Sequence, residues 1–167
     1  MKKGLICALI VLLADQISKA FVLSYFADHA SPVGITSFFN FVLAWNKGVS
    51  FSLLHSNHPA MPWVLVTIAL LICGVILHWM SMEKNQATIN CFGLILGGAL
   101  GNVIDRVCRG YVVDMLHFQF WPSYPTFNVA DICIVCGAIL GAVYYVLIYE
   151  KHDGRKQNGA ADPASGQ

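Results

Sequence analysis

The chain has 167 residues, of which 57% are hydrophobic and only 11% are charged, and its formal net charge is +1. With a mean hydropathy of +0.63 it has too little polar surface to cover a soluble globule, so we expect an integral membrane protein with one domain over residues 1–150. The small net charge and the lack of a basic block exclude a nucleic-acid-binding protein.

The first predicted element is a transmembrane helix over about residues 4–26. Two lysines before an apolar run that starts at Gly4 are also typical of a secretory signal peptide. The apolar pattern continues beyond Asp15 and Lys19, which favours a retained helix long enough to span a bilayer. Asp15 and Lys19 are spaced i, i+4 and share one face, so they are either a structural ion pair near the interface or part of a polar site.

Residues 27–61 are broken by proline, glycine and asparagine and are rich in aromatic residues. The segment ITSFFNFVLAW, followed by a turn at Asn46-Lys47-Gly48, predicts a small extracytoplasmic hairpin or sheet on the membrane surface, where aromatic rings settle. His55 and His58 form an HxxH pair. Without an adjacent Glu or a third ligand, this pair indicates solvated loop histidines, and we predict no metal site.

Two further spans are predicted, at about residues 62–80 and 89–104, with a short polar turn between them. The second of these spans carries glycines every four residues, a pattern that indicates close approach by a neighbouring helix. These glycines are Gly93, Gly97 and Gly101.

The third span ends in polar residues. Asn102 is three residues before Asp105 and four before Arg106, so the three share one end of the helix. Asp105 and Arg106 are sequence neighbours that diverge on a helix, and we expect them to make different contacts. An Asp or Arg at mid-membrane costs roughly 2.5 to 3.5 kcal/mol, so a functional site is the first hypothesis for this cluster.

Asp114 follows the β-branched pair Val112-Val113, which favours a strand. The fourth predicted span, about 129–149, begins just after Asn128, which resembles a helix N-cap, and Asp131 lies where the helix dipole favours a carboxylate. If Asp131 were the only polar residue at this end of the helix, helix capping alone would explain it. Here Asp114 and Asp105 are expected at the same membrane face, which favours a shared site.

The distribution of positive charge predicts the orientation in the membrane. Cytoplasmic segments are enriched in Lys and Arg, so both termini are expected to be cytoplasmic and the site to lie near the outer face. We expect the last segment, 151–167, which lacks large apolar residues, to be a disordered cytoplasmic tail. The residues on the predicted inner side are Lys2, Lys3, Lys84, Lys151, Arg155 and Lys156, and those on the outer side are Lys47 and Arg109.

Two neighbouring carboxylates cannot both ionise easily, so they share a proton and divide the work of base and acid. That division suits peptide hydrolysis by Asp114 and Asp131 without a cofactor. The sequence contains no GxSxG or HExxH motif and no outer-face cysteine paired with a nearby histidine. Spacing alone does not establish that the two carboxylates meet.

Buried Asp and Lys residues are equally expected in a small proton-coupled transporter or channel. Against this alternative, the polar residues gather near one face, and no polar path crosses to the other. A presenilin-like intramembrane protease is disfavoured because the chain contains no GxGD motif.

Five motifs, in order, resemble those of the bacterial signal peptidase II family of lipoprotein signal peptidases. They are ADQISK at 14–19, NKGVSF at 46–51, GGALGNVIDR at 97–106, GYVVDM at 110–115 and FNVAD at 127–131. The resemblance covers about the first 150 residues. It implies an all-α membrane protein, a four-transmembrane-helix bundle with a small extracytoplasmic β-structure, located in the bacterial inner membrane.

The resemblance also implies that Asp114 and Asp131 are a catalytic dyad, which cleaves diacylglyceryl prolipoproteins before the lipid-modified Cys. A monomer in contact with membrane lipids and inhibited by globomycin-type cyclic peptides is expected. Met115 stands where the family commonly has Phe. The residues that match the family's supporting polar and substrate-binding positions are Asp15, Lys19, Asn46, Gly48, Asn102, Asp105, Arg106 and Asn128.

Overall fold

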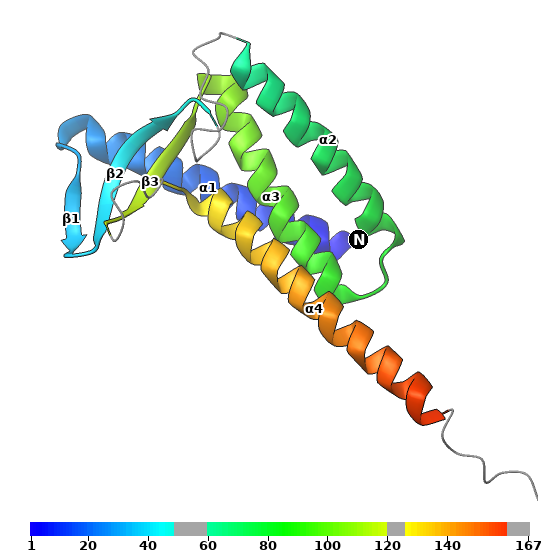
Figure 1. The fold of residues 1–167 in the computed structure, drawn as a ribbon. Coiled ribbons are helices and arrows are strands. Elements are labelled where there is room, and N and C mark those ends of the chain that lie inside the picture. Colours follow the sequence, from blue (N-terminus) through cyan, green and yellow to red (C-terminus); the bar gives the residue numbers. More distant parts are fainter. Residues whose placement is uncertain (49–59, 120–125, 160–167) are drawn as a thin grey trace, which may run out of the picture.

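The computed structural model describes residues 1–48, 60–119 and 126–159, with only the backbone for 148–159. Four helices form a bundle with a small sheet at one end (Figure 1). All four are long and apolar enough to cross a membrane, which confirms the predicted fold class. The helices are α1 (Lys2–Asp28), α2 (Met61–Met82), α3 (Gln86–Arg109) and α4 (Val129–Gly159).

Helix α3 is the centre of the bundle, since it packs against α1, α2 and α4. Its glycines bring the backbones together, as their spacing predicts. A Cβ atom on Gly93 would come within 2.5 Å of the Gly4 carbonyl oxygen in α1, and one on Gly98 would come within 2.5 Å of the Ala130 carbonyl oxygen in α4. The bare faces of α3 therefore fix how closely both neighbouring helices approach it.

We expect Gly98→Ala to lower the melting temperature in detergent, because a methyl group at the α3–α4 contact overpacks it at a cost of about 1–3 kcal/mol. Gly74→Ala in α2 is the matched control, since a Cβ there meets nothing within 4 Å. The control should be neutral or stabilising by up to about 1 kcal/mol through helix propensity. Equal melting temperatures for the two variants would contradict this account of the packing.

Helix α3 is longer at both ends than the predicted span of 89–104. It begins at Gln86 because the Asn85 side chain caps it, accepting hydrogen bonds from the Ala87 and Thr88 N–H groups. It continues to Arg109 because ion pairs neutralise the charged side chains of its last turns. Gly110, with φ of 79°, then ends the helix in a left-handed conformation that glycine adopts without steric cost.

The sheet contains β1 (Val33–Thr36), β2 (Phe39–Asn46) and β3 (Val112–Phe118), antiparallel in that order. A hairpin turn falls between β1 and β2, inside the predicted β segment ITSFFNFVLAW. At the predicted turn, Asn46–Gly48, β2 ends at Asn46, and the Gly48 N–H donates to Asn46 Oδ1 as in an Asx turn. His55 and His58 lie outside the described residues.

Strand β3 joins the sheet to the helices. Val113 and Met115 point to one side, where they form a buried cluster with Val22 of α1. Met115 is only 3% exposed, so its side chain packs against the end of α1. Alternation along the strand turns Asp114 to the opposite side, away from this apolar cluster.

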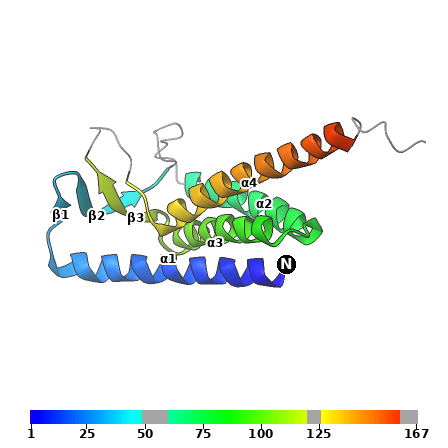
Figure 2. The same ribbon diagram turned by 90° about the horizontal axis from the view of Figure 1, so that it is seen from below.

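Helix α4 runs past the other helices at the end opposite the sheet (Figure 2). Its backbone is helical as far as Gly159, so the prediction of disorder from Lys151 is wrong for residues 151–159. Extending an existing helix adds one hydrogen bond for each residue fixed and avoids the cost of nucleation. Both the N-terminus and the described end of α4 lie at the end of the bundle away from the sheet.

Candidate active site

The polar side chains singled out from the sequence meet where the sheet joins the bundle. α1, β2, α3, β3 and the start of α4 all contribute to one hydrogen-bonded network. All ten predicted residues belong to it: Asp15, Lys19, Asn46, Gly48, Asn102, Asp105, Arg106, Asp114, Asn128 and Asp131.

Asp114 is fully buried on β3, in register with Ala44 of β2. Two amides hold its carboxylate: Asn46 Nδ2 donates to Oδ2 at 3.0 Å, and Asn128 Nδ2 donates to Oδ1 at 2.7 Å. Burial, followed by repulsion from the Asp131 carboxylate, raises the pKa of Asp114 to about 7, although both amide hydrogen bonds oppose this shift. The group therefore changes protonation near neutral pH.

Asp131 lies in the first turn of α4, where it both caps the helix and faces the site. The Asp131 N–H donates to Asn128 Oδ1 at 3.0 Å, and the Asn128 N–H donates to Asp131 Oδ2 at 3.3 Å. This reciprocal pair has the geometry of a capping box. The other oxygen, Oδ1, accepts a hydrogen bond from Asn102 Nδ2 at 2.8 Å.

Two asparagines connect the carboxylates. Asn128 Nδ2 donates to Asp114 and also approaches Asn102 Oδ1 at 3.2 Å, while Asn102 donates to Asp131. Asn128 is held in turn by the returning chain, because Phe127 pairs with Leu116 of β3 immediately before it. The local fold thus brings together two acidic residues that come from different elements.

Lys19 is completely buried, and three oxygen atoms surround its ammonium group. Its Nζ lies 2.8 Å from Asp15 Oδ2, 3.0 Å from Asp105 Oδ2 and 3.1 Å from Asn102 Oδ1. The two alternatives for Asp15 and Lys19 therefore coincide: they form an ion pair, and that ion pair is part of the polar site.

Arg106 and Asp105 make different contacts, as their positions on the helix predict. The guanidinium of Arg106 donates to the carbonyl oxygens of Asn102 and Gly48, each at 3.3 Å. Asp105 instead pairs with Lys19 and with Arg109. Arg106 thereby links the end of β2 to the end of α3.

Two side chains of the network, among the described residues, were not predicted as part of the site. Arg109 pairs with Asp105, and the i, i+4 spacing of the two was a signal for that contact. Gln16 donates to Asp15 Oδ2 at 3.1 Å and to the Gly101 carbonyl oxygen at 3.2 Å. Nothing in its sequence position distinguishes Gln16 from an interfacial side chain.

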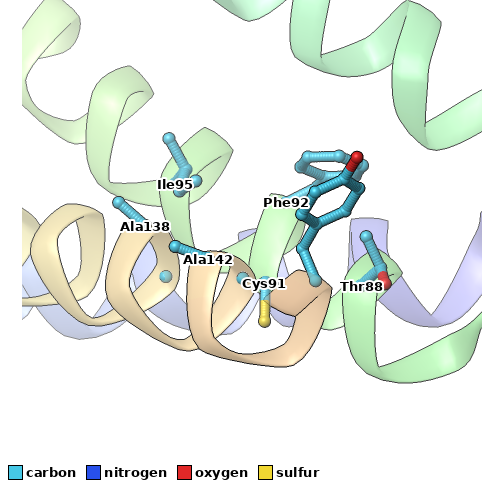
Figure 3. A pocket seen from close by; sticks show the side chains of 9 residues that line it. Thr88, Cys91, Phe92, Ile95, Ala138 and Ala142 are labelled. Atoms are coloured by element: carbon cyan, nitrogen blue, oxygen red, sulfur yellow. The ribbon is translucent and has the colours of Figure 1, made fainter. Parts of the chain in front are cut away.

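A hollow of about 260 Å³ lies between α3 and α4, away from this network (Figure 3). Its walls are almost wholly apolar, with Ile95, Ala138 and Ala142 among them. It offers no pair of acidic side chains for acid–base chemistry. The polar network is therefore the candidate active site.

The chain is similar to known proteins over most of its length. The family described as signal peptidase (SPase) II matches residues 7–147. A lipoprotein signal peptidase of Sphingopyxis alaskensis is 38% identical over 151 residues, covering 89% of this chain and 87% of that protein. A lipoprotein signal peptidase of Shewanella amazonensis is 40% identical over 135 residues, covering 78% and 79%.

Two solved bacterial membrane enzymes share the fold. One superposes with a TM-score of 0.73 at 22% identity, covering all of this chain and 96% of the other. The second has a TM-score of 0.71 at 24% identity, covering 87% and 93%. With the match to the family over most of its length, this chain belongs to the signal peptidase II family and is a membrane-embedded peptidase.

Proposed function

We propose that the chain is an aspartyl endopeptidase whose catalytic dyad is Asp114 and Asp131. The observation that carries the proposal is the linked pair of carboxylates, of which Asp114 has its pKa raised to about 7 partly by the charge of Asp131. Groups with such perturbed pKa values are frequent in active sites because acid–base catalysis works best near the operating pH.

In the proposed reaction one carboxylate is ionised and the other is protonated. The ionised group takes a proton from a water molecule, whose oxygen attacks the scissile carbonyl carbon. The neutral carboxyl group donates its proton to the carbonyl oxygen, which gives a tetrahedral diol. As the diol collapses and the C–N bond breaks, the carboxyl group that took the proton from water gives it to the leaving nitrogen, and the other carboxylate takes a proton from a diol hydroxyl group. The dyad is thereby restored, and no covalent enzyme intermediate forms.

The relatives are named lipoprotein signal peptidases, and for this chain we infer diacylglyceryl prolipoprotein substrates cleaved on the N-terminal side of the lipidated Cys. A lipid-anchored peptide already resides in the bilayer, so it can approach the site laterally. The dyad lies at the sheet end of apolar helices, which suits a scissile bond close to the membrane interface.

We further propose that the protein is a monomer in the bacterial inner membrane, with both termini cytoplasmic and the dyad near the outer face. The charge distribution supports this orientation, because the start of α1, with Lys2 and Lys3, and the turn between α2 and α3, with Lys84, lie at the end of the bundle opposite the sheet. Four spans also return the chain to the side on which it started. Family membership suggests inhibition by globomycin-type cyclic peptides.

The direct test is to incubate the purified protein with a lipidated prolipoprotein and to identify the products by mass spectrometry. We expect one cut immediately before the lipid-modified Cys. The same peptide without the diacylglyceryl group should be cut far more slowly. Absence of cleavage, or cutting at another bond, would contradict the proposal.

The raised pKa of Asp114 predicts the pH dependence of cleavage. If the working form carries one proton on the dyad, that proton is lost as pH rises through about 7, so kcat/KM should fall above this value. The hydrogen bond from Asn46 lowers the pKa of Asp114, and Asn46→Ala should therefore move the alkaline limb to higher pH. If the alkaline limb of the kcat/KM profile does not move in Asn46→Ala, the pKa of Asp114 does not determine that limb.

A further inference from the structure

We propose that Asp15 and Asp105 are positioning residues, each of which holds one carboxylate of the dyad in place through the backbone N–H of the residue before it. This inference rests on the proposed dyad. It assigns to two buried acidic side chains a task separate from the acid–base chemistry of Asp114 and Asp131.

Asp15 holds the start of α4. Its Oδ1 accepts a hydrogen bond from the Ala130 N–H at 3.0 Å, and both residues are completely buried. The first N–H groups of a helix have no partner within the helix, so an acceptor from α1 can fix the position of that end. The residue that follows Ala130 is Asp131.

Asp105 holds the start of β3 in the same way. Its Oδ2 accepts a hydrogen bond from the Val113 N–H at 3.1 Å, again between fully buried residues. The residue that follows Val113 is Asp114. Each member of the dyad is therefore preceded by a residue whose backbone is bound to a carboxylate on α1 or α3.

Lys19 joins the two anchors, because its ammonium group contacts both Asp15 and Asp105. Gln16 Nε2 also donates to Asp15 and lies 3.5 Å from Asp105 Oδ1. With Arg109 on the other side of Asp105, two cations face the two carboxylates. The anchors are thus neutralised within the protein, which suits positioning and leaves Asp114 and Asp131 as the acid and base.

This arrangement makes the separation of the dyad depend on α1 and α3. Displacement of a catalytic group by about 1 Å can cost on the order of a hundredfold in rate. Loss of either acceptor should therefore lower kcat, whereas KM should change little, because the anchors are buried and satisfied by protein groups.

The test compares variants that keep or remove the acceptor, all assayed below their melting temperatures. We expect Asp15→Ala and Asp105→Ala to lose about tenfold to a hundredfold in kcat with KM within about twofold. Asp105→Asn keeps an oxygen for the Val113 N–H and should recover most of the loss. Gly93→Ala, which strains the α1–α3 contact far from the dyad, is the control for lowered stability and should keep its kcat.

Wild-type kcat in a folded alanine variant would overturn the inference, as would an equal loss of kcat in Gly93→Ala at a matched decrease in melting temperature. If Asp105→Ala does not fold, Asp105→Asn decides, since a full loss of kcat in that folded variant contradicts the positioning role. Asp114→Asn and Asp131→Asn are assayed alongside. If those two variants are active, the proposed catalytic dyad is refuted. If they are inactive while Asp15→Ala keeps full activity, only the positioning role of Asp15 is refuted.

Discussion

Asp114→Asn and Asp131→Asn should each abolish cleavage of a lipidated prolipoprotein, with kcat lowered by about a hundredfold to ten-thousandfold. An amide can neither take a proton from water nor give one to the carbonyl oxygen. The side-chain volume is almost unchanged, so each variant should still fold. The measurement is single-turnover cleavage, with the melting temperature of each variant determined beforehand.

Asp28→Asn is the matched control for these two variants. Asp28 is the last residue of α1, its side chain is exposed, and no hydrogen bond or ion pair ties it to the described network. The substitution removes the same charge and should leave kcat at the wild-type value. Substantial activity in either dyad variant, beside a normal control, would contradict the proposed chemistry.

Lys19→Met should be the most destabilising single substitution in the network, lowering the free energy of unfolding by about 3–5 kcal/mol. It preserves much of the side-chain volume but leaves Asp15 and Asp105 buried without their shared cation. A buried charge that has lost its partner is costly because the protein interior solvates it poorly. Thermal or denaturant unfolding in a defined detergent measures the effect.

Removing one carboxylate charge should destabilise the protein less than removing the Lys19 cation. Asp15→Asn alone should lower the melting temperature, because Lys19 then keeps only Asp105 as a carboxylate partner. Combined with Lys19→Met, it should recover part of the lost stability, since removing both charges avoids an unpaired one. A wild-type melting temperature for Lys19→Met would contradict the ion-pair account. Unchanged stability with lost turnover in Asp15→Asn would instead place Asp15 in the chemistry.

The sequence predicted the contacts that depend on helical spacing. Asp15 with Lys19, the divergence of Asp105 from Arg106, and the cap at Asn128 follow from positions within one or two helical turns, where geometry is fixed by local structure. The glycine repeat of α3 likewise predicted close helix packing. These features need no knowledge of the rest of the fold.

Contacts between segments that are distant along the chain could not be predicted from the sequence. Pairing of β2 with β3 brings Asn46 to Asp114 across 68 residues, and Asp15 reaches the Ala130 N–H across 115. The latter contact uses a backbone donor, which every residue other than proline possesses, so no residue type marks it. The end of α3 was misplaced because its charged residues resemble a helix exit, whereas buried ion pairs allow the helix to continue.

The account depends on Asp114 and Asp131 acting together on one peptide bond. The most direct measurement is an experimental structure with a non-cleavable lipopeptide bound, in which the distances from both carboxylates to the scissile carbonyl are read. We expect each to reach that carbonyl directly or through one shared water molecule, within about 2.6–3.2 Å for each hydrogen bond. Carboxylates that face apart, with the peptide bond in contact with neither, would contradict it.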